Sequence, residues 1–408
     1  MQEKKQSLVP ELRFPGFEEE WEVRKIEDSF EERIEKNRSD LPLLSLGEDG
    51  LMLQSESQRK DNSNSDKSKY LRVAVGDIAY NTMRMWQGRC VYCNIEGIVS
   101  PAYTVCKTKE GIDPLFHYYL FKTNQMISIF HQHSQGLVND TLNLKYEAFS
   151  KIKYLLPSLP EQQKIAECLS SVDDLIREEA DQLQTIKDHK KGLMQQLFPK
   201  AGETTPKLRF PGFEGEWESP TIAEVFDIRN GYTPSKRIID YWQGGTIPWF
   251  RMEDIRENGG ILADAIQHIT PEAVKGSGLF KKNSIILATT ATIGVHAMII
   301  ADSLANQQFT NFSIRKSLSD KYYPLFVYYS FFVIDEWCKR NTNAGGLLSV
   351  NMPALQKQTF LTPSLPEQQK IADCLSSLDE EISAQQQKVE TLKEHKKGLM
   401  QKLFPAID

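Results

Sequence analysis

The stretch PEQQKIAECLSSVDDLIREEADQLQTIKDHKKGLMQQLF, residues 160–198, returns near the other end of the chain as residues 366–404, with 24 of its 39 residues unchanged. Similarity of this kind over so long a segment indicates an internal duplication. In both copies the apolar side chains recur at intervals of four and three residues, which is the heptad pattern of a helix that packs along another helix. The duplicated stretch therefore predicts two long helices that organise the chain.

The apolar positions of each copy form one stripe along its predicted helix. The stripe of the first copy consists of Ile165, Leu169, Val172, Ile176, Leu183, Ile186, Leu193 and Leu197, and that of the second consists of Ile371, Leu375, Leu378, Ile382, Val389, Leu392, Leu399 and Leu403. Polar residues interrupt each stripe twice, Glu179 and Lys190 in the first copy and Gln385 and Lys396 in the second. Such a narrow stripe needs a helical partner, so we predict a coiled-coil seam. Each helix would be about 55 Å long at 1.5 Å per residue.

The interrupting lysines favour an antiparallel pair. In a parallel pair Lys190 would face Lys396 across the seam. In an antiparallel pair Lys190 lies opposite Leu378 and Lys396 lies opposite Val172, so that each lysine stem covers an apolar neighbour while its ammonium reaches solvent. We therefore predict an antiparallel coiled coil; the alternative is that each helix packs only on its own domain.

Composition is that of a globular protein. The chain has 408 residues, of which 40% are hydrophobic and 25% charged, and this length allows two or three domains. We find no apolar run long enough to cross a membrane and no apolar signal-peptide core at the N-terminus, so the expected localisation is cytoplasmic, without a membrane partner. The six cysteines are expected to be reduced, because two of them, Cys168 and Cys374, occupy the same helical position in the two copies.

A second pair of repeats precedes the helices. The leader at residues 10–22 contains Leu-Arg-Phe-Pro-Gly-Phe and a tryptophan, and it returns at residues 206–218. Between leader and helix, each half carries a region that has diverged from its counterpart. We therefore predict four segments: a first domain with its leader at 1–154, a central long helix at 155–200, a second domain with its leader at 201–360, and a C-terminal long helix at 361–408.

Both divergent regions contain short strand-like runs. These runs lie at residues 71–75, 77–80, 89–92, 97–99 and 102–106 in the first region, and at 284–288, 295–300 and 309–314 in the second. A weak internal match continues after them, because residues 114–121 resemble 324–331 and Gly136 falls opposite Gly345 or Gly346. The predicted fold class is α+β, with two pseudo-symmetric, mainly-β domains that carry short helices and are separated by the two long helices.

Charge is distributed unevenly along the chain. The net charge is −6, yet residues 41–154 hold 13 lysines and arginines against 11 acidic residues, and residues 221–360 hold 14 against 12. The acidic excess therefore lies in the leaders and helices. A repeated scaffold with two different domains is suited to a linear, nearly two-fold ligand with two different half-sites, and duplex DNA has this property.

Polar and aromatic side chains that suit DNA gather in particular stretches of each domain. In the first domain the candidate DNA-binding residues are Asn81, Arg84, Trp86, Gln87, Arg89, His131, His133 and Asn139. Arginine pairs well with guanine, and asparagine or glutamine with adenine. In the second domain the candidates are Tyr232, Thr233, Ser235, Lys236, Arg237, Trp249, Arg251, Thr289, Thr290, Asn306 and Gln307. The alternative in the first domain is a structural hairpin in which Trp86 lies in the core and the arginines are only solvated.

Catalytic and metal motifs are missing from the sequence. We find neither a phosphate-binding glycine loop nor an H-E-x-x-H motif, and the seven histidines are scattered. Cys90, Cys93 and Cys106 could suggest zinc, but the first two alternate within a predicted strand and no second C-x-x-C pair exists. We therefore expect neither a catalytic residue nor a metal site. Two alternatives remain: a coiled-coil scaffold whose β domains bind proteins, and a stand-alone nuclease or methyltransferase.

The chain resembles the specificity subunits of type I restriction–modification enzymes over nearly its whole length. The resemblance rests on the twin PSLPEQQKIA-C-LSS helices, the KxHKKGLMQxLFP endings and the LRFPGF leaders. It also rests on DIAYNTMRMWQG and GIVSPAYTV in the first domain and on GYTPSK, IPWFRMEDI and ATIG in the second.

The resemblance implies a non-catalytic DNA-binding adaptor in a system of defence against foreign DNA. Each target-recognition domain would read one half of a bipartite, asymmetric target, and the antiparallel helices would set the spacing between the halves. The helices would also dock two copies of an adenine-N6 methyltransferase subunit, to which restriction and translocase subunits add. S-adenosylmethionine, Mg²⁺ and ATP would belong to those partners, leaving this chain without a cofactor.

Overall fold

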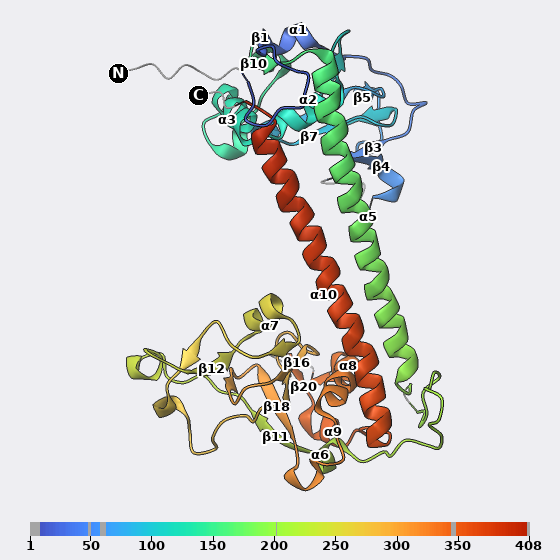
Figure 1. Ribbon diagram of the computed structural model, residues 1–408, viewed down its shortest axis with the longest axis vertical. Helices are drawn as coiled ribbons and strands as arrows, with labels where there is room; N and C mark the ends of the chain where they lie inside the picture. Colours follow the sequence, from blue (N-terminus) through green and yellow to red (C-terminus); the bar gives the residue numbers. More distant parts are fainter. Residues whose placement is uncertain (1–8, 48–49, 58–62, 201, 344–347, 406–408) are drawn as a thin grey trace. The chain divides into compact units, whose positions relative to one another are not determined.

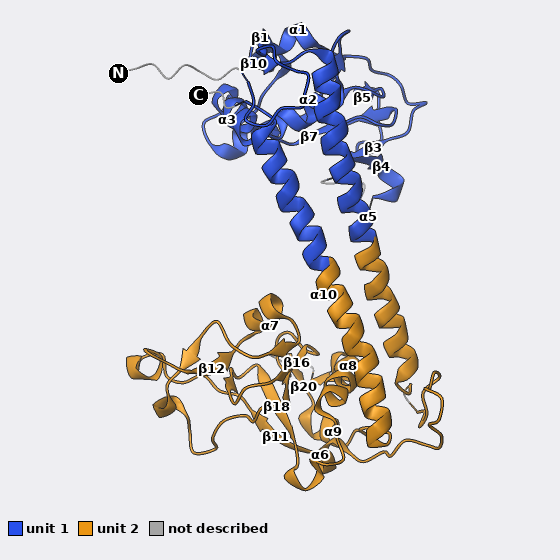
Figure 2. Cartoon of the chain, in the orientation of Figure 1, with its two compact units in different colours: residues 1–181, 386–408 blue, residues 182–385 orange. Residues whose placement is uncertain are grey.

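The structure is a computed structural model, and it describes residues 9–47, 50–57, 63–200, 202–343 and 348–405 (Figure 1). The chain divides into two compact units, residues 1–181 with 386–408 (unit 1) and residues 182–385 (unit 2) (Figure 2). Each unit therefore contains one β-rich domain and a part of both long helices. The predicted boundaries of four separate segments stay a prediction, and Gly345 and Gly346 lie outside the described residues.

Unit 1 is built around a four-stranded antiparallel sheet with the strand order β2-β9-β6-β7. Its strands are β1 (Glu22–Lys25), β2 (Phe30–Glu32), β3 (Leu44–Leu46), β4 (Leu51–Leu53), β5 (Leu71–Val73), β6 (Ile78–Asn81), β7 (Cys90–Tyr92), β8 (Gly97–Val99), β9 (Tyr103–Thr108) and β10 (Lys153–Leu156). Its short helices are α1 (Ile26–Ser29), α2 (Pro114–Phe121), α3 (Asn124–His133) and α4 (Tyr146–Phe149). The remaining strands form the pairs β1–β10, β3–β4 and β5–β8.

Unit 2 contains a five-stranded sheet with the order β11-β18-β15-β16-β13. Its strands are β11 (Phe226–Asn230), β12 (Ile247–Phe250), β13 (Ile261–Leu262), β14 (His268–Ile269), β15 (Ser284–Ala288), β16 (His296–Ile299), β17 (Leu304–Ala305), β18 (Phe309–Ile314), β19 (Thr342–Asn343) and β20 (Ser349–Val350). Its short helices are α6 (Ile222–Val225), α7 (Met252–Asn258), α8 (Pro324–Arg340) and α9 (Met352–Gln356). Strands β14, β12 and β17 form a smaller sheet.

The two main sheets share their topology. Strands β2, β9, β6 and β7 of unit 1 correspond in order to β11, β18, β15 and β16 of unit 2. The predicted β-rich regions and the duplication are therefore confirmed at the level of the fold. The copies differ after this sheet. In unit 1, α2 ends at Phe121 and Thr123 caps α3 by accepting the Met126 N–H at 3.3 Å, whereas α8 continues without a break.

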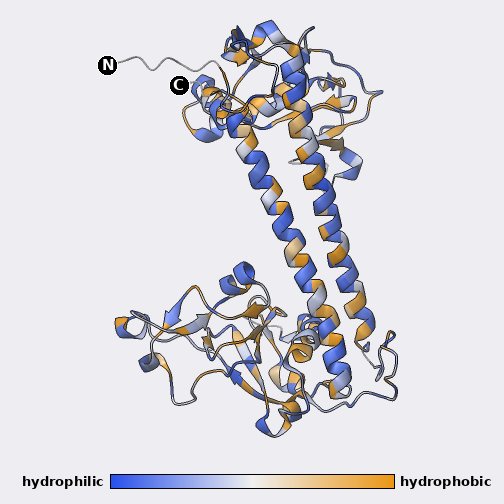
Figure 3. Cartoon of the chain, in the orientation of Figure 1, coloured by the Kyte–Doolittle hydropathy of each residue, from blue (hydrophilic) through white to orange (hydrophobic). Residues whose placement is uncertain are grey.

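The long helices α5 (Leu159–Leu197) and α10 (Leu365–Lys402) pack antiparallel, as predicted. Along both helices the seam positions are buried or half-buried while most of their neighbours are exposed, and Figure 3 shows the corresponding alternation of hydrophobic and hydrophilic residues. Within unit 1, Lys388 Nζ lies 2.6 Å from Glu179 Oε1. This contact joins facing positions of the two helices, so it reports the same register as the predicted seam.

The environment of the seam lysines differs from the expectation. Their ammonium groups do not end in solvent: Lys396 Nζ lies 2.6 Å from Asp173 Oδ1 in unit 1, and Lys190 pairs with Asp379 in unit 2. Each aspartate lies one residue beyond the apolar neighbour that the register assigned to its lysine. The pairing keeps the charged groups compensated where they are partly withdrawn from water.

A tyrosine from the adjoining domain completes each of these pairs. The hydroxyl of Tyr119, on α2, donates to Asp173 at 2.8 Å, and that of Tyr329, on α8, donates to Asp379 at 2.7 Å. Burial, together with the hydrogen bond to the carboxylate, raises the pKa of both phenols. Each Lys–Asp–Tyr cluster thus connects both long helices to the β-rich domain of its unit.

The repeated Pro-Glu-Gln motif at the start of each long helix binds the leader and the domain. In unit 1 the Glu161 carboxylate, which is buried, accepts two hydrogen bonds of 2.8 Å from Arg13 of the leader. Arg209 and Glu367 form the same fork at 2.7 and 2.8 Å in unit 2. Such bidentate pairs fix orientation. The repeated leader is therefore a segment that docks on the long helix of its own unit.

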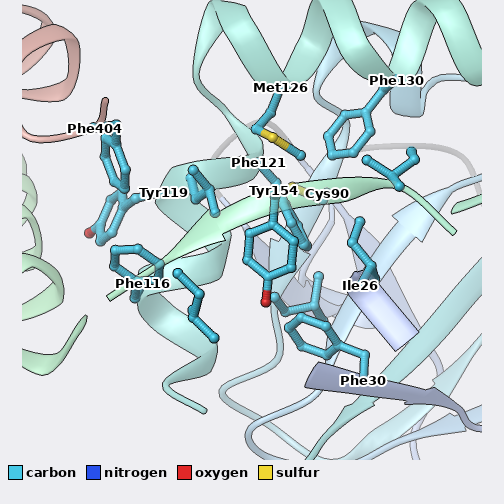
Figure 4. Packing of buried hydrophobic residues seen from close by; sticks show 14 of the residues in the cluster. Ile26, Phe30, Cys90, Phe116, Tyr119, Phe121, Met126, Phe130, Tyr154 and Phe404 are labelled. Atoms are coloured by element: carbon cyan, nitrogen blue, oxygen red, sulfur yellow. The ribbon is translucent and has the colours of Figure 1, made fainter. Parts of the chain in front are cut away.

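Glutamine follows glutamate in this motif and fixes the domain helix. Gln162 Oε1 accepts the Asp113 N–H at 2.9 Å just before α2, and Gln368 Oε1 accepts the Tyr323 N–H at 2.9 Å just before α8. Aromatic packing adds to these contacts, since Phe404, just past the end of α10, lies 5.5 Å from Phe116 of α2 (Figure 4). The residues that are identical at the starts of the two helices thus make the same contacts in both units.

Reversing one seam charge should destabilise unit 1. We expect Lys396→Glu, and separately Asp173→Lys, to lower the free energy of unfolding by about 1–3 kcal/mol, because each puts like charges together in a half-buried site. Combining both changes should restore most of the loss in thermal unfolding of the full chain. Lys393→Glu is the control, because Lys393 is exposed and pairs within its own helix. Equal losses from all four variants would contradict the assignment.

Stability should also fall in acid because of His117. This histidine is fully buried between Tyr154 Oη at 2.9 Å and the Asp113 carbonyl at 2.8 Å, and burial lowers its pKa to about 4. Since the unfolded chain binds the proton near pH 6.5, unfolding should become easier as the pH falls from about 6.5 towards 4. His117→Val copies the equivalent Val327 of unit 2 and should flatten this part of the plot of unfolding temperature against pH. An unchanged slope would exclude His117 as its source.

Candidate functional site

In unit 1, four of the predicted DNA-binding residues line one recess at the end of β6. The recess has a volume of about 730 Å³, and its lining includes Asn81, Arg84, Gln87 and Arg89. Lys122, from the end of α2, and Tyr103, from β9, also line it. Neither residue could be found from sequence patterns, because only the folded domain brings β9 and α2 to the end of β6.

Local hydrogen bonds shape the loop that carries these residues. Asn81 Oδ1 accepts the Met83 N–H at 3.0 Å, and Trp86 Nε1 donates to the Met83 carbonyl at 3.0 Å. Gly88 closes the following 3-10 turn in the left-handed conformation, with φ of 72°. The fully buried residue of the turn is Met85. Trp86 is half-buried rather than part of the core, and Arg84 and Arg89 are exposed. The hairpin therefore presents polar side chains at the surface.

The remaining first-domain candidates lie next to this recess. His131 and His133 are exposed at the end of α3, and the rings of His131 and Trp86 meet edge to face at 5.8 Å. His133 Nδ1 is 2.9 Å from the Ile129 carbonyl. Asn139 is exposed in the segment that follows α3. The candidate residues of unit 1 therefore belong to two adjoining segments.

In unit 2, backbone hydrogen bonds join the four stretches that carry the candidates. The Tyr232 N–H donates to the Ala305 carbonyl at 2.9 Å, and the Asn306 N–H donates to the Phe250 carbonyl at 3.0 Å. The Thr289 N–H donates to the Gln308 carbonyl at 2.9 Å. Stretches that are far apart in the sequence thus form one surface region.

Individual candidates in this region differ in exposure. Ser235, Lys236, Arg237 and Gln307 are exposed; Tyr232, Thr233, Arg251, Thr290 and Asn306 are half-buried; Trp249 and Thr289 are buried. Thr233 Oγ1 donates to Gln307 Oε1, which links the first stretch to the last. Arg251 lies with its guanidinium 6.0 Å from the Trp249 ring. Hydroxyl, amide and guanidinium groups that suit base edges and phosphates are therefore presented together.

The two buried candidates serve the shape of the region. Trp249 is 2% exposed, and its Nε1 donates to the Tyr232 carbonyl at 3.0 Å. Thr289 Oγ1 lies 2.9 Å from Thr310 Oγ1 inside the unit. Their polar side-chain atoms are already paired within the protein. Both residues hold neighbouring candidates in place, and a direct contact from either to DNA would require the region to rearrange.

The described residues contain no cluster of three or more histidine, cysteine or acidic side chains arranged to hold a metal ion. Cys90 and Cys93 are buried, and burial raises the pKa of each thiol to about 12. A thiol in this state is a poor metal ligand, because zinc binds the thiolate. Among all the residues that the structure describes, no helix is both long enough and apolar enough to cross a membrane.

Gly231 should be essential for the close packing of residues 230–237 against residues 305–306 in unit 2. A Cβ atom at this position would lie 2.3 Å from the Asn306 carbonyl oxygen. We therefore expect Gly231→Ala to lower the unfolding temperature and to expose residues 230–237 to limited proteolysis. Gly276→Ala is the control, because its added Cβ would meet nothing within 4 Å. Equal behaviour of the two variants would contradict the close approach.

Comparison with known proteins identifies relatives across most of the chain. A family model described as "Type I restriction modification DNA specificity domain" matches residues 18–188 and again residues 214–394. The two matches coincide with the two halves of the duplication.

Curated relatives are specificity subunits of type I restriction enzymes. The EcoprrI specificity subunit of Escherichia coli is 47% identical over 152 residues, which is 37% of this chain and 37% of that protein. The MjaVIII specificity subunit of Methanocaldococcus jannaschii is 23% identical over 360 residues, which is 83% of this chain and 82% of the relative. High identity is thus local, whereas the full-length similarity is weaker.

Solved structures share the fold. The S subunit of a type I restriction–modification system from M. genitalium superposes with a TM-score of 0.57 at 14% identity, covering 98% of this chain and 100% of that one. A chain from a study of complex assembly and conformational transition of a type I system gives a TM-score of 0.60 at 15% identity, covering 97% and 99%.

Proposed function

Because the chain belongs to the non-catalytic family of type I restriction–modification DNA specificity subunits, we propose that it reads a bipartite, asymmetric DNA target. The β-rich domain of each unit would read one half. One observation carries this proposal: the same sheet is present twice, and the loops at the end of the equivalent strands β6 and β15 carry different polar side chains. Equal frameworks with unequal reading residues suit two different half-sites.

The chemistry of the two regions supports different base preferences. The recess of unit 1 is lined by two arginines, an asparagine and a glutamine; arginine forks onto guanine, and the amides pair with adenine. The region of unit 2 instead presents hydroxyls and amides, with Lys236 and Arg237 exposed for phosphate contact. The base sequence of the DNA would be read through these side chains, while lysine contacts to phosphates would position the DNA backbone.

The twin helices support a role in assembly and spacing. Their N-terminal and C-terminal segments are nearly identical in sequence, and both carry exposed residues outside the seam. Two equal surfaces suit two copies of one partner. We infer that this partner is the adenine-N6 methyltransferase subunit, that restriction and translocase subunits add to the complex, and that the helix pair sets the spacing of the half-sites. S-adenosylmethionine, Mg²⁺ and ATP would then act in the partners.

The proposed function can be tested by methylome sequencing. The chain is co-expressed with its methyltransferase partner in cells without other adenine methylation, and long-read sequencing should show methylation at one bipartite motif. Exchange of residues 41–154 for the corresponding domain of another family member should change only one half of that motif. Methylation that lacks a bipartite motif, or a change in both halves, would contradict the proposal.

Arginines of the recess should contribute specificity. In the assembled methyltransferase complex, Arg84→Ala and Arg89→Ala should each weaken binding to the specific duplex by about 1–3 kcal/mol and relax the preference in one half-site, because a fork onto guanine is lost. Arg24→Ala is the matched control, since Arg24 is an exposed arginine that pairs with Glu22 on β1. Complex assembly should be unaffected. Equal affinity of all variants in fluorescence anisotropy would remove the recess from the DNA interface.

A further inference from the structure

A small rigid loop stands beside the recess of unit 1. This tip loop, residues 135–143, is closed at its base by two backbone hydrogen bonds of 2.9 Å between Gln135 and Asn143. Within it, Thr141 Oγ1 accepts the N–H groups of Leu137 and Val138 at 3.2 Å. Hydrogen bonds thus hold both the base and the tip of the loop.

Close packing inside the tip loop adds to this rigidity. A Cβ atom on Gly136 would lie 2.7 Å from the Thr141 carbonyl group. Only glycine therefore allows the backbone at position 136 to approach Thr141 this closely. The chain just after the loop is also anchored beside the recess, because the Leu144 N–H donates at 2.8 Å to the carbonyl of Thr82, which follows the recess residue Asn81. Its conformation is therefore set before any ligand binds.

The tip presents apolar side chains to water. Leu137 is 100% exposed and Val138 is 61% exposed. Burying a leucine side chain stabilises a protein by about 1.5–3 kcal/mol. This fold forgoes that stabilisation at Leu137, although hydrogen bonds hold the loop in place. A preorganised apolar tip is suited to insertion into a partner, because little order remains to be gained on binding.

A similar sequence occurs in unit 2. At the offset that aligns Pro114 with Pro324, Gly136-Leu137-Val138 falls opposite Gly346-Leu347-Leu348. Residues 344–347 lie outside the described part, but the flanking strands β19 and β20 pair, and Leu348 is 48% exposed. The Val350 N–H donates to the Thr289 carbonyl at 2.9 Å, which matches the anchor of the tip loop. Two domains with divergent polar loops have thus kept a glycine followed by two aliphatic residues.

The neighbours of the tip loop indicate what it meets. Asp140 of the loop lies 4.0 Å from Arg84, and the preceding helix brings His131 against Trp86. The tip loop therefore lies beside the side chains that we assign to base reading. The apolar surface of a DNA duplex is its base stack, and proteins open it by inserting leucine, isoleucine or phenylalanine between base steps.

We propose that Leu137 in unit 1, and in unit 2 Leu348, which falls opposite Val138, is an apolar wedge that enters a base step in or beside its half-site. This inference rests on the proposed reading of DNA by each unit. Insertion unstacks the step at a cost that depends on the bases, least for flexible pyrimidine–purine steps. The wedge would thus add selectivity at a step that makes no hydrogen bond to the protein.

The test uses the complete methyltransferase complex and duplexes that carry its mapped motif. The probe is 2-aminopurine, placed at successive positions through each half-site, because its fluorescence rises when its neighbours unstack. Wild-type complex should give a rise at one step of each half. Leu137→Ala should abolish the rise in one half and weaken binding about tenfold, in line with the loss of buried apolar groups. Leu348→Ala should act on the other half alone.

Two controls separate a wedge from other contacts. Val75→Ala removes an exposed apolar side chain, 63% exposed, from the opposite end of β6 and should change nothing. A mismatched base pair at the affected step is easier to unstack. The mismatch should therefore increase the affinity of the Leu137→Ala complex more than that of the wild-type complex.

Several results would overturn the wedge while the proposed function stands. These are normal affinity and signal for Leu137→Ala, weaker binding with no 2-aminopurine rise in wild type, and weaker assembly with the methyltransferase subunit in the absence of DNA, which would make the loop a protein contact. Failure of the wild-type complex to bind any duplex selectively would instead overturn the proposed function, and the wedge with it.

Discussion

The Lys–Asp–Tyr cluster is the interaction on which the rest of the fold depends. A lysine in an apolar seam is tolerated only if its charge is compensated, and Asp173 supplies this for Lys396, as Asp379 does for Lys190. Both pairs exist only when the helices run in opposite directions in one register. The tyrosine of each cluster, Tyr119 in unit 1, extends that constraint to the domain. Charge pairing thus determines which ends of the two helices meet in each unit.

From this constraint follows the contrast between conserved scaffold and divergent surface within one chain. Residues that contact the helices, such as Arg13 with Glu161 and Arg209 with Glu367, keep their identity in both copies because each contact must be made twice. The loops at the ends of β6 and β15 differ in sequence between the two copies. A protein that reads two different half-sites needs both properties at once.

Sequence alone predicted the periodic parts of the structure well. Heptad spacing identified both helices, the interrupting lysines identified their antiparallel direction, and the short apolar runs identified strands such as β15 and β18. Contacts between distant segments were missed: the partners of the seam lysines lay one residue beyond the stripe, and Lys122 joins the recess only through the folded sheet. Trp249 was among the predicted DNA-binding residues, yet it is buried and its indole N–H is paired inside the unit. Periodicity reports which face is buried, but it does not report such pairings.

The central claim is that the antiparallel helices act as a spacer between two reading domains. Its most direct measurement is the methylated motif of a variant with one extra heptad in each long helix, after Asp181 in α5 and after Gln385 in α10, where the helices pass from one unit to the other. Seven residues add about 10 Å to a helix, which is about three base pairs of DNA at 3.4 Å each. The account predicts a motif with both half-sites unchanged and a spacer longer by about three base pairs. An unchanged spacer, or altered bases in either half-site, would contradict it.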